Sequence, residues 1–183
     1  MKPPNHRTIT VAEAVAQFGI ERLLGDDFDD LIGDRLNEDD SCLVFDGATT
    51  CAGDLDLNRT QPVAFGEPWD RQRHGLIVVD GSLAIGQIDM RGVDGLLVLG
   101  DLICDSIHLC ETLVFVQRGL VARNAVRATA DKEWHENTAV TLGPLYVRVH
   151  GTVSSPVVET WCMPLRHLSW TADSGSEETL VLR

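Results

Sequence analysis

Short runs of apolar residues recur along the middle of the chain, and each run is followed by a glycine and then by spaced apolar residues. Two successive glycine intervals, Gly81 to Gly100 and Gly100 to Gly119, are 19 residues each. The two outer intervals, of 34 and 32 residues, contain the same unit with an insertion. A regular period of this size is typical of a repeat architecture. The glycines that mark the five units are Gly47, Gly81, Gly100, Gly119 and Gly151.

Apolar residues occupy the same columns from unit to unit. The columns four before, two before and two after each glycine share the parity of one face of an extended strand. A further apolar column, seven after the glycine, has the opposite parity and predicts a bend. Gln117 and Arg123 interrupt the columns, so either the register slips by one residue in the fourth unit or both side chains face a polar cavity. Two of these columns are Leu43, Ile77, Leu96, Phe115, Val147 and Thr49, Leu83, Leu102, Val121, Val153.

These columns predict a chain dominated by β-structure, specifically a parallel β-solenoid of the right-handed β-helix type with about five coils. The solenoid is predicted over residues 42–160, with insertions at about 58–74 and 127–144. Because equal positions of a stacked repeat lie on one edge, both insertions are expected on the same side, like the walls of a saddle. Trp69 lies in the first insertion, and Trp134 and His135 lie in the second. The tryptophans are either partner contacts or lids over the repeat.

Residues 1–41 are predicted to form a small helical cap and an acidic linker. Thr10 stands three residues before Glu13, which is the spacing of a capping box, and Gly19 is a candidate end for that helix. Caps cover the open strand edges and exposed core at the ends of a repeat stack. Residues 161–183 are predicted to be the cap at the other end.

The charge of the chain narrows the choice of partner. The formal net charge is −13, from 28 acidic and 15 basic residues. This balance disfavours nucleic acid and membrane surfaces and favours a basic protein partner, although it can also serve only to keep the protein from associating. A calcium loop is rejected because Phe28 stands where the first ligand is required. The candidate partner-binding residues are Asp26, Asp27, Asp29, Asp30, Asp39, Asp40, Trp69, Trp134 and His135.

The five cysteines are odd in number and lack CxxC spacing. Cys51 and Cys104 share a column with Ile85, so they are interpreted as small buried hydrophobic residues in a reducing compartment. The chain has no apolar segment of about 20 residues and no signal peptide at its start, which predicts a cytoplasmic protein with no membrane contact. No cofactor or metal is predicted.

Residues with catalytic chemistry form no known motif. Hexapeptide acyltransferases repeat apolar residues every six positions, and that series fails here on the third side. His108 is a possible base for acyl transfer, with Asp89 one unit away. Asp105 and Asn124 share a column, which allows a carboxylate site of the kind that pectin-degrading coils use. Neither arrangement includes a nucleophile or phosphate motif, and the sequence favours a protein that is not an enzyme.

The middle of the chain resembles bacterial polymer-forming β-solenoid proteins of the bactofilin kind. The segments that carry this resemblance are LIVVDGSLAIGQI, LLVLGDLICDSI and LVFVQRGLVARNAV, within residues 42–158. The resemblance implies a β-solenoid that assembles head to tail into filaments through bare ends. The predicted caps and the two insertions depart from that pattern and argue against filaments.

The sequence therefore favours a non-enzymatic protein-binding module. Its most concrete form is a cytoplasmic immunity protein that binds and occludes a basic bacterial toxin domain, because acidic complementarity accelerates capture. A self-associating structural or scaffolding protein is the alternative. A carbohydrate-acting or acyl-transfer enzyme is the third hypothesis.

Overall fold

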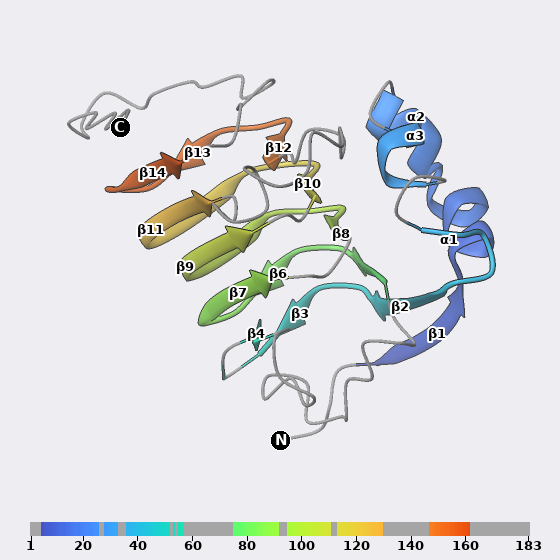
Figure 1. The fold of residues 1–183 in the computed structure, drawn as a ribbon. Helices are drawn as coiled ribbons and strands as arrows, with labels where there is room; N and C mark the ends of the chain where they lie inside the picture. The colour runs from blue at the N-terminus through green and yellow to red at the C-terminus, as the bar shows by residue number, and fades with distance from the viewer. Residues whose placement is uncertain are drawn as a thin grey trace.

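Two sheets of mainly parallel strands lie face to face, and three short helices in the described residues cover the outer side of one of them (Figure 1). The prediction of a mostly β chain with parallel strands is confirmed. Successive repeat units place one strand in the first sheet and one or two strands in the second, so the chain crosses between the sheets at every unit. The computed structural model describes residues 5–25, 28–32, 36–51, 53, 55–56, 75–91, 95–110, 113–129 and 147–161.

The first sheet follows the order β1-β2-β5-β8-β10-β12 in the described part of the chain. From β2 onward all neighbours are parallel, whereas β1 runs antiparallel to β2. The strands are β1 (His6–Thr10), β2 (Ser41–Asp46), β5 (Leu76–Asp80), β8 (Gly95–Val98), β10 (Leu113–Val116) and β12 (Val147–Val149).

The second sheet contains two short strands from some units and one long strand from others. Ile85 and Ile88 are both buried although they are three residues apart, so the chain changes parity between them. This confirms the predicted bend. The strands are β3 (Thr49–Thr50), β4 (Leu55–Asp56), β6 (Leu83–Ala84), β7 (Gln87–Arg91), β9 (Leu102–Cys110), β11 (Leu120–Thr129), β13 (Val153–Ser154) and β14 (Val158–Trp161).

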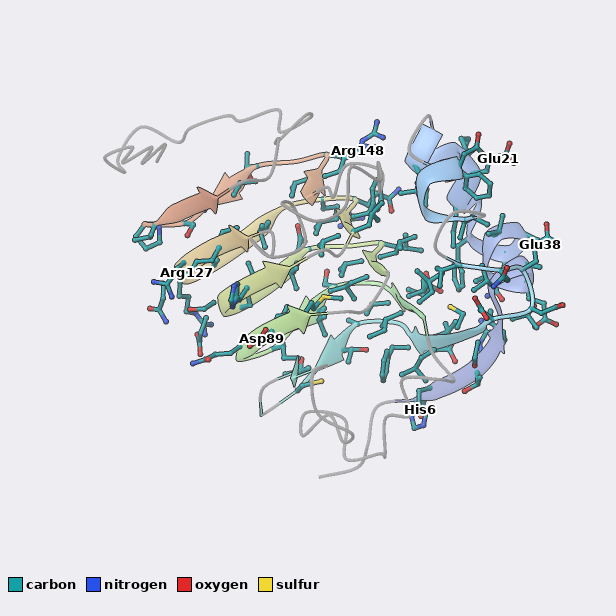
Figure 2. All side chains as sticks on the ribbon, in the orientation of Figure 1. His6, Glu21, Glu38, Asp89, Arg127 and Arg148 are labelled. Carbon is teal, nitrogen blue, oxygen red and sulfur yellow. The ribbon has the colours of Figure 1, made fainter. Side chains whose placement is uncertain are left out.

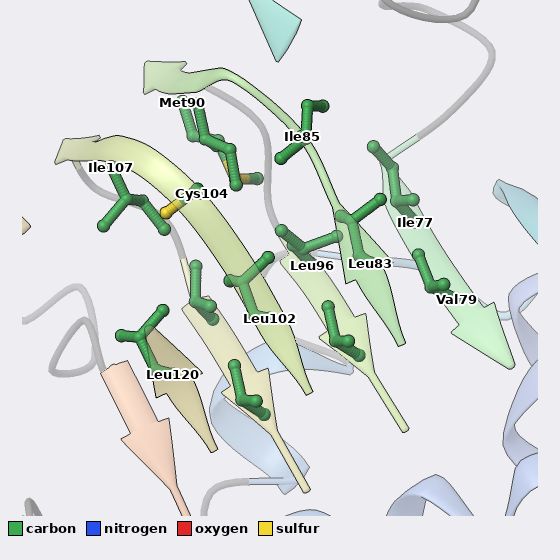
Figure 3. Packing of buried hydrophobic residues seen from close by; sticks show 14 of the residues in the cluster. Ile77, Val79, Leu83, Ile85, Met90, Leu96, Leu102, Cys104, Ile107 and Leu120 are labelled. Carbon is green, nitrogen blue, oxygen red and sulfur yellow. The ribbon is translucent and has the colours of Figure 1, made fainter. Parts of the chain in front are cut away.

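The space between the sheets is filled by stacked aliphatic side chains (Figure 3). Ile77 pairs with Leu96 in the first sheet, and Leu83 pairs with Leu102 in the second. All four are fully buried. Burial of a side chain of this size stabilises the fold by roughly 1.5–3 kcal/mol, so each added unit extends a shared core.

The fourth unit is displaced by one residue from the predicted columns. Val114 pairs with Leu96, and Leu120 pairs with Leu102. The inward positions predicted for Phe115 and Val121 are therefore wrong. Phe115 is buried on the opposite side of the first sheet, and Val121 is 40% exposed.

A β-bulge then restores the register. Arg123 and Asn124 together lie opposite Asp105, so that Val126 again pairs with Ile107. Of the two alternatives for the fourth unit, the slip in register is the one observed. Gln117 and Arg123 are both exposed on the surface.

Glycines allow the corners between the sheets to stack closely. A Cβ atom on Gly100 would lie 2.6 Å from the carbonyl carbon of Gly81 and 2.6 Å from the Ser82 Oγ. The same corner is tied by side chains, because the Asp101 amide donates to the Ser82 Oγ at 3.0 Å and the Gly119 amide donates to the Asp101 Oδ1 at 2.9 Å. Only glycine leaves room for this contact at Gly100.

The N-terminal segment forms α1 (Val11–Phe18), α2 (Ile20–Leu24) and α3 (Phe28–Leu31). The predicted capping box is confirmed. The Glu13 amide donates to the Thr10 Oγ1 at 3.1 Å, and the Thr10 amide donates to the Glu13 Oε2 at 2.9 Å. Gly19 ends α1 in the left-handed conformation, with φ of 61°, as its position predicts.

The helices lie on a face of the repeat, although the sequence predicts that they cap its end. Val11, Ala14, Ile20 and Leu24 pack against side chains on the outer face of the first sheet. The edge of that sheet is covered by β1, which pairs with β2 along its whole length. The reason lies in the central strands β2, β5, β8 and β10, which contain runs of successive buried apolar residues and need cover on both faces. The outer-face residues are Cys42, Val44, Leu76, Val78, Leu97, Leu113 and Phe115.

The two predicted insertions follow β4 and β11. Strand β11 continues to Thr129, so the second insertion begins later than the predicted residue 127. The ends of β7, β9 and β11 are in register, and β4 ends opposite Asp89 of β7, so β7 and β9 lie between the strands that the insertions follow. Residues 58–74, 130–146 and 162–183, including most of the predicted C-terminal cap, lie outside the described residues.

Candidate interaction surfaces

The outer side of the helical layer is acidic. Glu21, Asp29, Glu38 and Asp39 are exposed, and Arg22 is an exposed base on the same layer. Figure 2 shows Glu21 and Glu38 on the side of the helices that points away from the sheets. The amphipathic helices cause this arrangement, because their apolar faces are buried against the first sheet and their charged faces point outward.

The acidic turn before β2 is fixed to the start of α1. The Val11 amide donates to the Asp40 carbonyl at 2.8 Å, and the Ala12 amide donates to the Glu38 carbonyl at 3.0 Å. These bonds satisfy two of the amides that a helix start leaves without a partner within the helix. The Asp40 carboxylate in turn accepts from the Asn37 amide at 2.7 Å. Glu38 and Asp39 are therefore held in a defined position.

Arg148 joins the helical layer to the far end of the first sheet. Its Nη1 donates to the carbonyl of Leu24, the last residue of α2, at 2.6 Å. A guanidinium at a helix C-terminus also compensates the partial negative charge of the last carbonyls. The layer is thus held to β12 by Arg148 and continues from β1 at the other edge of the sheet.

A second surface is the outer face of the second sheet, which no helix of the described residues covers. Asp89, His108 and Arg127 pair across β7, β9 and β11 and form one row. The His108 Nδ1 lies 3.9 Å from the Asp89 Oδ1. Figure 2 shows Asp89 and Arg127 on the side of the molecule opposite to the helices.

The fourth repeat unit supplies most of the positive charge on this face. Residues 113–129 contain Arg118, Arg123 and Arg127 but no acidic residue. The Arg123 Nη1 lies 2.8 Å from the Asp105 Oδ1, with the two side chains 66% and 42% exposed. An exposed pair of this kind contributes only about 0–1 kcal/mol to stability. The main effect of the pair is therefore that the charge of Arg123 neutralises the charge of Asp105 at this place on the surface.

Four of the predicted partner-binding residues lie in the described part of the chain, and five lie outside it. Asp29 and Asp39 are exposed and Asp40 is half-buried, whereas Asp30 lies in α3. The others lie outside the described residues, so the saddle of two loops remains a prediction. These residues are Asp26, Asp27, Trp69, Trp134 and His135.

The residues considered for catalysis are distributed over an exposed face. Asp89 and His108 are 30% and 35% exposed on an open sheet. The bulge places both Arg123 and Asn124 opposite Asp105, and Asp105 forms an ion pair with Arg123. This arrangement holds Asp105 as an ion-pair partner on the surface.

Cys51 and Cys104 are buried, as their shared column predicts, and Cys42 is buried as well. Cys42, Cys51 and Cys104 are free thiols in the two cores. Burial raises the pKa of Cys42 and of Cys104 to about 12, and that of Cys51 to about 11. Such thiols are protonated and inert near neutral pH.

Within the described residues, no group of three or more His, Cys, Asp or Glu side chains is placed to hold a metal ion. None of the described helices has both the length and the apolar character to cross a membrane. Both findings apply only to the part of the chain that the structure covers.

Two features escaped the sequence analysis although the signal was present. The runs LIVV at residues 76–79 and LVFV at 113–116 are apolar at every position, which indicates strands buried on both faces. Their second apolar face is where the helices bind. The other feature is the fourth unit, with three arginines and no acid in a chain of strongly negative charge.

Comparisons with protein-family models, with curated proteins and with solved structures found no match to this chain. Its function is therefore inferred from the geometry and charge of the chain itself.

Proposed function

We propose that the chain is a parallel β-solenoid of about five coils, related in its repeat to bactofilin-like proteins, and that it serves as a protein-binding module. The pairing of successive units in both sheets supports the solenoid, because strands one unit apart lie in register from β2 to β12 and from β3 to β13. A stacked repeat of this kind provides a rigid body with extended faces for binding.

The partner that we propose is a basic toxin domain, which makes the protein a cytoplasmic immunity protein. One observation carries this proposal, namely the exposed carboxylates of Glu21, Asp29, Glu38 and Asp39 on the outer side of the helical layer. Clustered charge of one sign raises the rate at which an oppositely charged protein is captured, and complementarity suppresses wrong partners.

The attachment of the helical layer suits a binding surface. The acidic turn bonds to the start of α1, and Arg148 holds the end of α2. A surface that is already ordered before binding loses little conformational entropy when the partner arrives. This favours tight occlusion of a partner by the helical layer.

The test is affinity capture with the full chain as bait, in a lysate of the cell that encodes it, at low and high salt. The acidic-layer variant carries Glu21→Gln, Asp29→Asn and Asp39→Asn. The matched control removes the same charge from the sheets with Asp46→Asn, Asp80→Asn and Asp105→Asn. We expect the wild type and the control to retain one stoichiometric basic protein at low salt and the acidic-layer variant to lose it.

Two results would contradict the proposal. One is the absence of any stoichiometric partner with the wild-type bait. The other is a partner that both triple variants retain equally, since binding would then not depend on the acidic layer. A toxin gene next to the gene for this chain would support the immunity role independently.

A structural or scaffolding role is the second candidate, and the strand edges favour it. Strand β1 covers only the first-sheet edge, whereas β3 and β12 end their sheets without a further strand in the described residues. Open edges are templates for pairing with another chain. Electron microscopy at high protein concentration tests this role, and the absence of filaments or longer assemblies would exclude end-to-end stacking.

A further inference from the structure

We draw no further inference here: the strongest candidate, the outer face of the second sheet where Asp89, His108 and Arg127 pair across β7, β9 and β11, has acids on both flanking strands, with Asp56 on β4 and Glu159 on β14, and nothing in the structure shows what covers it.

Discussion

The two sheets share one core but differ in what their outer faces carry. The outer face of the first sheet presents Val44, Val78, Leu97 and Phe115, all fully buried beneath the helices. The outer face of the second sheet presents Asp89, His108 and Arg127 and is not covered by a described helix. The same repeat thus produces a face that must be covered and a face that can remain in water.

The difference originates in the strands themselves. First-sheet strands such as β5 and β10 are apolar at successive positions, whereas second-sheet strands alternate apolar and polar residues. A strand of the first type is destabilised when either face is exposed to water, because apolar side chains lie on both faces. A strand of the second type needs only one covered face. The outer face of the first sheet therefore needs the helical layer as cover, whereas the polar positions of the second sheet can remain in water.

A carboxylate substituted on the outer face of each sheet should give the largest difference in stability between the two faces. Leu97→Asp puts a carboxylate between the first sheet and the helices, where Leu97 is fully buried, and should prevent folding at a cost above about 4 kcal/mol. Val121→Asp makes the same kind of change on the open face, where the side chain is 40% exposed, and should cost less than about 1 kcal/mol. Chemical denaturation measures both. Comparable losses in the two variants would show that the second face is also covered.

Truncation of Phe115 should have the next largest effect. The ring is fully buried beneath the helices and stacks edge-on with His150, with 5.0 Å between the ring centroids. Phe115→Ala should lower the free energy of unfolding by about 3–5 kcal/mol, because it removes buried surface and leaves a cavity. The control Val121→Ala should stay within about 0.5 kcal/mol of the wild type. If Val121→Ala costs more than Phe115→Ala, the assigned register of the fourth unit is wrong.

Removal of the Arg148 contact should loosen one end of the helical layer. Arg148→Ala deletes the bond from Nη1 to the Leu24 carbonyl and should cost about 1–2 kcal/mol. Relative to the wild type, hydrogen exchange should become faster in α2 and stay unchanged in β9, because the lost contact joins α2 to β12 and does not involve the second sheet. The comparison variant Arg123→Ala removes the exposed pair with Asp105 and should cost less than about 1 kcal/mol. Equal acceleration in α2 and β9 would contradict a local role.

The smallest effect concerns the thiol beneath the helices. Burial raises the pKa of Cys42 from 9.0 to about 12, so the folded state keeps a proton that the unfolded state loses above pH 9. Stability should therefore fall as the pH rises from about 9 towards 12, by about 1 kcal/mol per pH unit for this thiol. Denaturation of Cys42→Ala between pH 8 and about 10.5 should show a shallower decline than the wild type. Parallel declines would mean that Cys42 is exposed to solvent.

Much of the repeat could be predicted from the sequence, because local signals agreed with the fold. The glycine period, the columns of Ile77 and Leu96, and the capping box of Thr10 and Glu13 each depend on residues near one another in the chain or in the repeat. The burial of Cys51 and Cys104 followed from the same columns. Whether Cys51 and Cys104 point inward depends only on the spacing of apolar residues along each unit, and that spacing can be read from the sequence.

The fourth unit shows where this reasoning fails. Its run LVFV is apolar at every position, so the pattern does not specify which residues face inward. The glycine spacing suggested Phe115, but packing placed Val114 and Val116 in the inner core and Phe115 beneath the helices. A one-residue slip exchanges the two faces, and only contact with both covering layers decides between them.

By itself, the sequence determined that the chain is a repeat of short β-strands and, outside the fourth unit, which side chains form the inner core. The tertiary structure decided that the helices cover the first sheet, that β1 pairs with the edge of β2, and that the bulge at Arg123 and Asn124 restores the register. The physical reason is that period and parity are local properties of a strand. The choice of which apolar face meets which element depends on contacts between residues far apart in the chain, such as Leu24 and Arg148.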